Sequence, residues 1–196
     1  MQRFLRTGLT GAALTVGIAS IVGMARFDSD HAEAAPPQIR LVADLSDKIL
    51  YVYEADTVAL MYDISDGKDA YPTPRGTFNI RKLTWNPSWV PPDSEWARKK
   101  TAKAPGESGN PMKVVKIFFK EPDYYIHGTG DVGSLGASES HGCLRMSPDD
   151  VMQVGKWVME HGGGWRGENW FMRIIHSRRQ EKVIFLAKPV SISVVE

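Results

Sequence analysis

Hydrophobic and polar residues alternate along the chain from residue 38 to residue 81, in short runs separated by turn-forming residues. In the first run, Ile39, Leu41 and Ala43 would share one face of a strand, because successive side chains of a strand point to opposite sides. Turns at Ser46-Asp47 and Ala55-Asp56 separate this run from the next two. The pattern predicts an antiparallel meander with strands at 38–44, 48–54, 57–65 and 77–81.

Residues 84–112 break the alternation with five prolines and three tryptophans. A helical turn near 94–100 is the only regular structure that this stretch favours. Loops of this length in compact domains are usually functional or disordered. We interpret 84–112 as a wall or cover over a site, and the alternative is a surface flap that only completes the core.

The second half of the chain mixes strands with helices. Strands are predicted at 114–119 and 124–126, and the second of them ends at His127. A helix is predicted to begin at Ser147, because serine caps helices, Pro148 suits the first helical position and acidic residues follow. Its apolar stripe consists of Val151, Val154, Trp157 and Val158, and it should end at 162–164. A second helix at 167–179 and two closing strands in 182–195, separated at Pro189, complete a mainly β fold with a few short α-helices.

Composition and charge limit the class of protein. A chain of 196 residues with 42% hydrophobic and 24% charged residues is typical of one globular core. The net charge of +1 gives no broad basic field, so nucleic acid is not an expected partner. The single cysteine excludes an intramolecular disulfide.

Residues 1–35 have the pattern of an export segment. Arg3 and Arg6 precede an uncharged apolar run at 7–25, and Ala32 and Ala34 would suit cleavage after Ala34. An uncleaved membrane anchor is the alternative, because the run is long enough to span a bilayer. We therefore expect a protein exported to the periplasm or wall side of the membrane, touching the membrane only through this segment, with residues 36–196 as its functional domain.

The stretch 127–146, HGTGDVGSLGASESHGCLRM, carries the candidate chemistry. A thiol is mostly protonated at neutral pH, so a nucleophilic Cys143 needs a base, and His127 could supply it. The carbonyl of Gly128 could fix the tautomer of that histidine. Gly142 would leave backbone N–H groups free to face a developing oxyanion, and Arg145 could hold an anionic or carbonyl group of the substrate. This set of residues predicts acyl transfer through a thioester.

Two other interpretations of the same residues stay open on residue types alone. His127, His141 and Cys143 could be zinc ligands, completed by Asp131 or Glu139. Cys143 could also be a small buried side chain without chemistry. The pattern implies no metal or cofactor under the thiol interpretation.

The motif H-G-T at 127–129 followed by S-H-G-C-L-R-M at 140–146 resembles the signature of the L,D-transpeptidase catalytic domain, also called the YkuD domain. The resemblance covers about 38–160 and includes SDKILYVY at 46–53, TPRGTF at 73–78, NPSW at 86–89 and NP at 110–111. It implies a β-rich, sandwich-like domain acting on peptidoglycan outside the cytoplasmic membrane. The tail at 164–196 differs from the commonest ending of the family and looks like the closure of its larger members.

The resemblance also implies roles. Cys143 would attack the carbonyl before the terminal D-alanine of a tetrapeptide stem, with meso-diaminopimelate at that position in many bacteria. D-alanine would leave, and an amine on a second stem, a D-amino acid or a protein lysine would accept the acyl group. His127 would transfer protons, and the supporting positions would be Gly128, Ser140, His141, Gly142 and Arg145.

The family members are also acylated by carbapenem β-lactams, so the same is expected here. An L,D-carboxypeptidase, which uses water as acceptor, and a non-catalytic wall-binding protein are the alternative functions.

Overall fold

One long closing strand, β10, organises the fold of this chain. The computed structural model describes residues 39–196, so the predicted export segment at 1–35 lies outside the described residues. The strands are β1 Ile39–Asp44, β2 Ile49–Glu54, β3 Thr57–Asp63, β4 Asp66–Gly67, β5 Gly76–Trp85, β6 Lys113–Lys120, β7 Tyr124–Gly128, β8 Ser138–Ser140, β9 Leu144–Met146 and β10 Lys182–Val195. The helices are α1 Pro148–His161 and α2 Glu168–Ser177, with short 3-10 turns at Glu95–Ala97 and Val132–Ser134.

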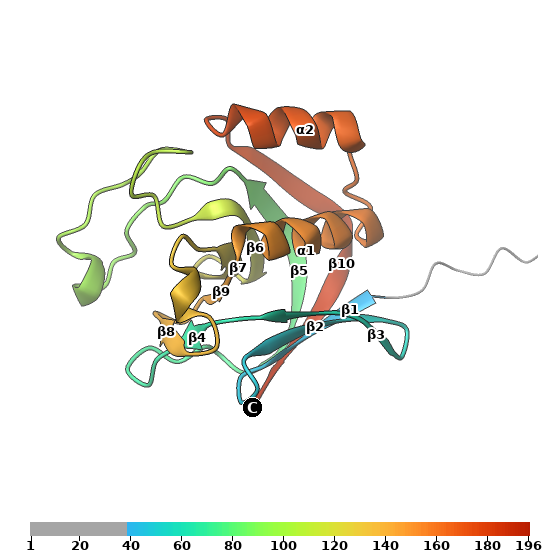
Figure 1. Ribbon diagram of the computed structural model, residues 1–196, viewed down its shortest axis with the longest axis horizontal. Coiled ribbons are helices and arrows are strands. Elements are labelled where there is room, and N and C mark those ends of the chain that lie inside the picture. The colour runs from blue at the N-terminus through green and yellow to red at the C-terminus, as the bar shows by residue number, and fades with distance from the viewer. Residues whose placement is uncertain (1–38) are drawn as a thin grey trace, which may run out of the picture. The chain divides into compact units, whose positions relative to one another are not determined.

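Eight strands form one sheet in the order β3-β2-β1-β10-β5-β6-β7-β9. β10 joins its halves, because it pairs in parallel with β1 and antiparallel with β5. The predicted break at Pro189 appears as an irregularity within one strand, since the pairing with β5 shifts between Phe185 and Val190. In Figure 1 the β1–β3 meander crosses the direction of β5 and β10, with α1 lying against the sheet and α2 beyond it. The mainly β, sandwich-like prediction is confirmed.

The helix α1 packs its apolar stripe on the sheet. Val151, Val154 and Val158 are fully buried, whereas Trp157 of the predicted stripe is only partly buried and stacks on His161. The predicted cap is present, because the Ser147 hydroxyl accepts a hydrogen bond from the amide of Asp150 at 3.1 Å.

The strand β5 is longer than its sequence pattern indicates. It continues from the predicted end at residue 81 to Trp85, which is fully buried and packs edge-on to Phe171 at 5.1 Å. The irregular segment therefore begins at Asn86 rather than at residue 84. We call residues 86–112 the proline loop.

Asn110 holds the proline loop together. Its buried side-chain amide donates to the carbonyls of Pro87 and Ala104, both at 3.0 Å, and its oxygen accepts from the amide of Met112 at 2.8 Å. These bonds join both ends of the loop and its middle. The loop consequently has a defined conformation although it contains little regular structure.

Replacing Asn110 with alanine should lower the free energy of unfolding by about 2–3 kcal/mol, because two buried carbonyls lose their donor. Denaturant unfolding of the purified protein measures this value. Asn169→Ala is the matched control, because Asn169 is exposed on α2, and it should change stability by less than about 0.5 kcal/mol. Equal effects of the two substitutions would contradict the role given to Asn110.

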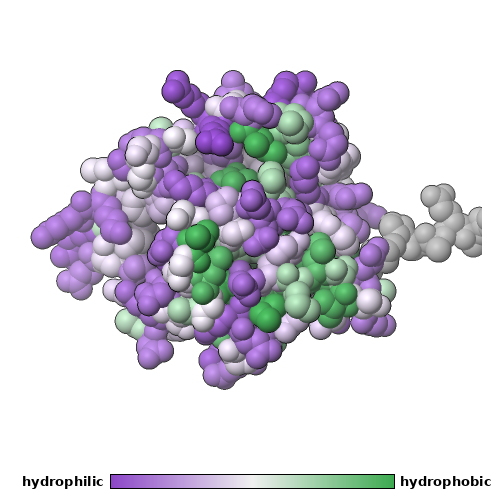
Figure 2. Space-filling view, viewed as in Figure 1, coloured by the Kyte–Doolittle hydropathy of each residue, from purple (hydrophilic) through white to green (hydrophobic). Residues whose placement is uncertain are grey.

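The visible face in Figure 2 is mostly hydrophilic, with several separate apolar areas rather than one continuous patch. Exposed large apolar side chains include Trp165, Met172 and Phe185. Within residues 39–196, no helix has the length and apolar character needed to cross a membrane.

Candidate active site

A cleft of about 890 Å³ lies between the proline loop and the strands β6 and β7. The loop contributes Trp89 and Trp96 to its lining. His127 and Cys143 line the same cleft, as do Ser140, His141 and Arg145. The proline loop is therefore a wall of the site, as the sequence predicted.

Cys143 lies just before β9, beside the strand β7. These strands pair in parallel with Ile126 opposite Leu144 and His127 opposite Arg145, so the neighbouring Tyr125 faces Cys143. The backbone N–H and the phenol of Tyr125 lie near enough to the sulfur to lower the pKa of the Cys143 thiol. The thiol itself donates to the carbonyl of Asp123 at 3.3 Å.

His127 is buried at the end of β7, and only 4% of its surface is exposed. Its Nδ1 lies 2.9 Å from the carbonyl of Gly128, which was the predicted acceptor. A carbonyl can only accept, so this contact places a proton on Nδ1 and leaves Nε2 as the basic nitrogen. The ring also packs edge-on to Tyr125 at 5.6 Å, so the tyrosine contacts both His127 and Cys143.

Burial keeps both candidate groups uncharged at neutral pH. Burial lowers the pKa of His127 to about 4, with the charges of Arg145 and Lys116 acting in the same direction and the Gly128 carbonyl opposing them. Burial raises the pKa of Cys143 to about 11, although the hydrogen bonds from Tyr125 lower it. At neutral pH, Cys143 is therefore a thiol and His127 a neutral imidazole, and both line the same cleft.

The buried neutral His127 should make the protein less stable in acid. Its folded pKa of about 4 lies below the unfolded value of 6.5, so the unfolded state binds more protons between these limits. The contribution of neutral His127 to the free energy of unfolding is therefore fully present above about pH 6.5. It falls by up to about 3 kcal/mol as the pH decreases to 4.

Chemical unfolding at several pH values tests this dependence, with His127→Gln beside the native protein. The variant should lose less stability between pH 7 and pH 4, whereas His176→Gln, at an exposed histidine of α2, should follow the native curve. If the native protein and His127→Gln lose equal stability between pH 7 and pH 4, the pH dependence does not arise from His127.

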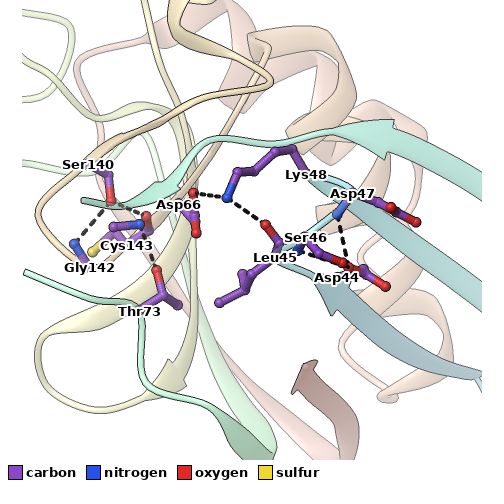
Figure 3. A network of polar contacts seen from close by, with 11 residues as sticks. Asp44, Leu45, Ser46, Asp47, Lys48, Asp66, Thr73, Ser140, Gly142 and Cys143 are labelled. Atoms are coloured by element: carbon purple, nitrogen blue, oxygen red, sulfur yellow. Dashed lines mark hydrogen bonds and ion pairs between the residues drawn. The ribbon is translucent and has the colours of Figure 1, made fainter. Parts of the chain in front are cut away.

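The turn that carries Cys143 is closed by Ser140. Its hydroxyl donates to the carbonyl of Cys143 at 2.6 Å and accepts from the amide of Gly142 at 3.0 Å (Figure 3). The amide of Gly142 is thus engaged within the turn, whereas the sequence suggested that it would be free for an oxyanion. Gly142 has φ +102°, and a Cβ there would lie 2.9 Å from the ring of Tyr124.

An ion pair between the half-buried Lys48 and the buried Asp66 lies next to this turn. Asp66 of β4 pairs with Lys48 at 3.0 Å, and β4 forms a small two-stranded sheet with β8, which ends at Ser140. Thr73 adds a hydrogen bond from the amide of Gly67 at 2.9 Å. Figure 3 shows the Lys48–Asp66 pair beside the Ser140–Cys143 turn.

His141 stacks against the wall of the cleft. Its ring lies 4.0 Å from Trp96 of the proline loop, nearly parallel to it, and 4.9 Å from Tyr71. Burial lowers its pKa, as do the charges of Lys68 and Arg145. His141 therefore joins the turn that carries Cys143 to the proline loop.

Arg145 is half-buried in the cleft, and its guanidinium lies 4.0 Å from the carboxylate of Asp131. A pair at this distance leaves several N–H donors of the guanidinium unengaged by Asp131. Within residues 39–196, no three His, Cys, Asp or Glu side chains come together in a way that could hold a metal ion.

The sequence profile of the YkuD family, the L,D-transpeptidase catalytic domain, matches residues 38–184. The chain belongs to this family. The profile therefore extends beyond 38–160, the range suggested by the motifs, and includes residues 164–184 of the tail at 164–196.

Several L,D-transpeptidases are similar to this family member along most of its length. The Bacillus licheniformis YkuD protein, an L,D-transpeptidase by name, is 28% identical over 151 residues, covering 77% of this chain and 75% of its own. A protein of Fuscovulum blasticum, also named as an L,D-transpeptidase, is 29% identical over 172 residues, covering 73% of this chain and 89% of its own.

Solved L,D-transpeptidases share the fold. The Mycobacterium smegmatis structure aligns with a TM-score of 0.51 at 22% identity and covers 82% of this chain. The Enterococcus faecium structure aligns with a TM-score of 0.52 at 15% identity and covers 80% of it. This chain spans only 59% and 49% of those two chains, respectively.

Two cleft residues of this L,D-transpeptidase family member were missed in the sequence. Tyr125 gave no signal beyond a strand position, because its contact with Cys143 depends on the parallel pairing of β7 and β9. Lys116 did give a signal in the sequence, because its charged side chain interrupts the apolar run VVKIFF at 114–119.

Proposed function

We propose that this chain is a cysteine-dependent L,D-transpeptidase that acts on peptidoglycan stem peptides. The observation that carries the proposal is the common cleft of Cys143 and His127, with the histidine tautomer fixed by the Gly128 carbonyl. The thiol and the basic Nε2 are thus the two groups that acyl transfer through a thioester requires.

In the first step, the sulfur of Cys143 attacks the carbonyl carbon before the terminal D-alanine, and the thiol proton passes to Nε2 of His127. The amide bond breaks, and the leaving amine of D-alanine takes that proton. This leaves a thioester on Cys143 and a neutral His127. The phenol of Tyr125 lies beside the sulfur that forms this thioester.

In the second step, an acceptor amine attacks the thioester and gives its proton to His127, which returns it to the departing sulfur. An acceptor amine on a second stem yields a stem-to-stem cross-link. A D-amino acid or a protein lysine gives the corresponding conjugate. Water would give an L,D-carboxypeptidase with the same donor half-reaction.

We also propose that this reaction takes place outside the cytoplasmic membrane, because residues 1–35 have the pattern of an export segment. Carbapenem-type β-lactams are expected to acylate Cys143. A related observation is that the solved structure Ldtfm, aligned with a TM-score of 0.53 at 16% identity, is an avibactam carbamoyl enzyme.

Purified protein incubated with tetrapeptide muropeptides, followed by mass spectrometry, tests the proposal. Stem-to-stem dimers with loss of D-alanine support a transpeptidase, whereas tripeptides alone support a carboxypeptidase. Cys143→Ala should abolish both products and the mass adduct formed with a carbapenem. Products that persist in this variant, or unchanged muropeptides with the native protein, would overturn the proposal.

A further inference from the structure

Lys116 occupies an unusual position on the strand β6. The pairing of β6 with β7 shifts between Lys113, opposite Gly128, and Lys116, opposite His127, so β6 carries a bulge at this point. Val114 within the bulge has φ +63°, a conformation that costs free energy for a β-branched residue. The amide of Asn86 donates to the Val114 carbonyl at 2.7 Å and holds this conformation. Strain of this kind commonly marks functional positions.

The bulge places the Lys116 side chain in the cleft that contains Cys143. Its ammonium donates to the carbonyl of Ser88 at 2.9 Å and lies 4.9 Å from the centre of the Tyr125 ring. The side chain is half-buried, and its charge influences both Cys143 and His127. The ammonium therefore lies in the same cleft as Cys143 and His127.

Lys116 has no carboxylate within ion-pair distance among residues 39–196. Lys48, the other well-covered lysine described above, pairs with Asp66 at 3.0 Å. Covered lysines are normally paired, because removing an ammonium from water is costly. Burial lowers the pKa of Lys116 accordingly. One hydrogen bond to Ser88 leaves two donors of the ammonium for another group.

The other charges in the cleft do not supply the missing anion. Asp131 is directed to Arg145 at 4.0 Å, and the carbonyl of Asp123, not its carboxylate, contacts the thiol. Glu181 attracts Lys116 from a distance, but its carboxylate is engaged by the amide and hydroxyl of Ser88. Ser88 is thus fixed as a support for the lysine.

We propose that Lys116 binds a carboxylate of the acyl-donor peptide and so selects donors that carry one beside the scissile bond. The inference rests on the proposed function and names the donor group that this site recognises. The carboxylate is either the terminal one of the leaving residue or the side-chain one of the residue that is acylated. Lys116 is a specificity-determining residue and takes no part in proton transfer.

Three synthetic tetrapeptide donors distinguish these sources: the free acid, its C-terminal amide, and the peptide with its diaminopimelyl carboxylate amidated. Each is assayed for kcat/KM of D-alanine or D-alaninamide release with native protein and with Lys116→Met. The native protein should prefer the free acid about 10- to 100-fold over one of the two amides. Lys116→Met should reduce that ratio to near one, and Lys116→Arg should restore part of it.

The ratio of kcat/KM values between donors separates donor recognition from thiol reactivity. A change in the reactivity of Cys143 alone would change kcat/KM by the same factor for all three donors. Lys188→Met is the matched control, since Lys188 is an exposed strand lysine of β10, and it should keep the native ratio. A native ratio in Lys116→Met, or equal losses for all three donors, would overturn the inference.

Binding to protein that cannot react separates this inference from the proposed function. Calorimetric titration of the same donors into Cys143→Ala, with and without Lys116→Met, requires no turnover. Tighter binding of the free acid that disappears with Lys116→Met supports the inference even if the native protein releases no D-alanine. Equal binding of acid and amides by Cys143→Ala would disprove it even if transpeptidation is observed.

Discussion

Replacing His127 with glutamine should slow acylation of Cys143 by about 10³-fold, the range that a positioned general base contributes. Glutamine fills a similar space and can still contact the Gly128 carbonyl, but it cannot accept the thiol proton. Because only about one Cys143 in 10⁴ is ionised at pH 7 with a pKa of about 11, the thiolate cannot replace the base. Carbapenem adduct formation, followed by mass, measures the rate.

The pH dependence of the same rate distinguishes a neutral pair from a preformed ion pair. In the native protein the rate should rise with pH around 4, as His127 loses its proton, and then stay level through neutral pH. In His127→Gln it should instead rise tenfold per pH unit towards the pKa of Cys143 near 11.

His141→Gln is the control for this experiment, because the proposed base is His127 and the His141 ring stacks on Trp96. In this variant the rate should still rise with pH around 4, as in the native protein, and the loss of rate should be smaller than in His127→Gln.

Alkylation of the native protein by neutral iodoacetamide should be slow at pH 6 and accelerate with pH. Rapid alkylation independent of pH above 5 would show a thiolate at rest and contradict the neutral pair.

Much of the fold follows from local pattern. The alternation at 38–44 places Ile39, Leu41 and Ala43 in the core, and the cap at Ser147 starts α1 as predicted. These features depend on neighbouring residues and on the contrast between polar and apolar side chains. The extent of β5 did not follow, because Trp85 is in a strand only through its pairing with β6 and β10.

The site was predictable where it depends on adjacent residues. The contact between His127 and the Gly128 carbonyl involves neighbours in the chain and could be foreseen. The contact of Tyr125 with Cys143 and the placement of Lys116 could not, because they arise from a parallel pairing and a bulge. The engagement of the Gly142 amide by Ser140 depends on a turn geometry that residue types leave open.

The turn at residues 140–143, which carries Cys143, is therefore held by three sets of contacts. Ser140 closes it internally, the Lys48–Asp66 pair supports the small sheet that precedes it, and the stacked ring of His141 attaches it to the proline loop. A side chain added within this turn would strain the backbone geometry that these contacts hold. The glycine at its centre is the position where such an effect can be measured.

Replacing Gly142 with alanine should reduce acylation of Cys143 by at least about 100-fold while the domain stays folded. Its φ of +102° is unfavourable for an L-residue, and the added methyl would lie 2.9 Å from Tyr124. A shift of about 1 Å in the sulfur position is enough for a loss of this size. Carbapenem adduct formation gives the rate, and thermal unfolding verifies the fold.

Substitutions at two other glycines between β7 and β9 distinguish the effect of backbone strain from that of a steric clash. Gly136 has φ +83° with no atom near the position of a Cβ, so Gly136→Ala tests backbone strain alone. Gly133 has neither feature, so Gly133→Ala should be neutral in both rate and stability. We expect Gly136→Ala to cost about 1 kcal/mol of stability and little activity, because it lies outside the hydrogen bonds of Ser140. If Gly142→Ala reacts as fast as Gly133→Ala, the turn geometry does not position the nucleophile.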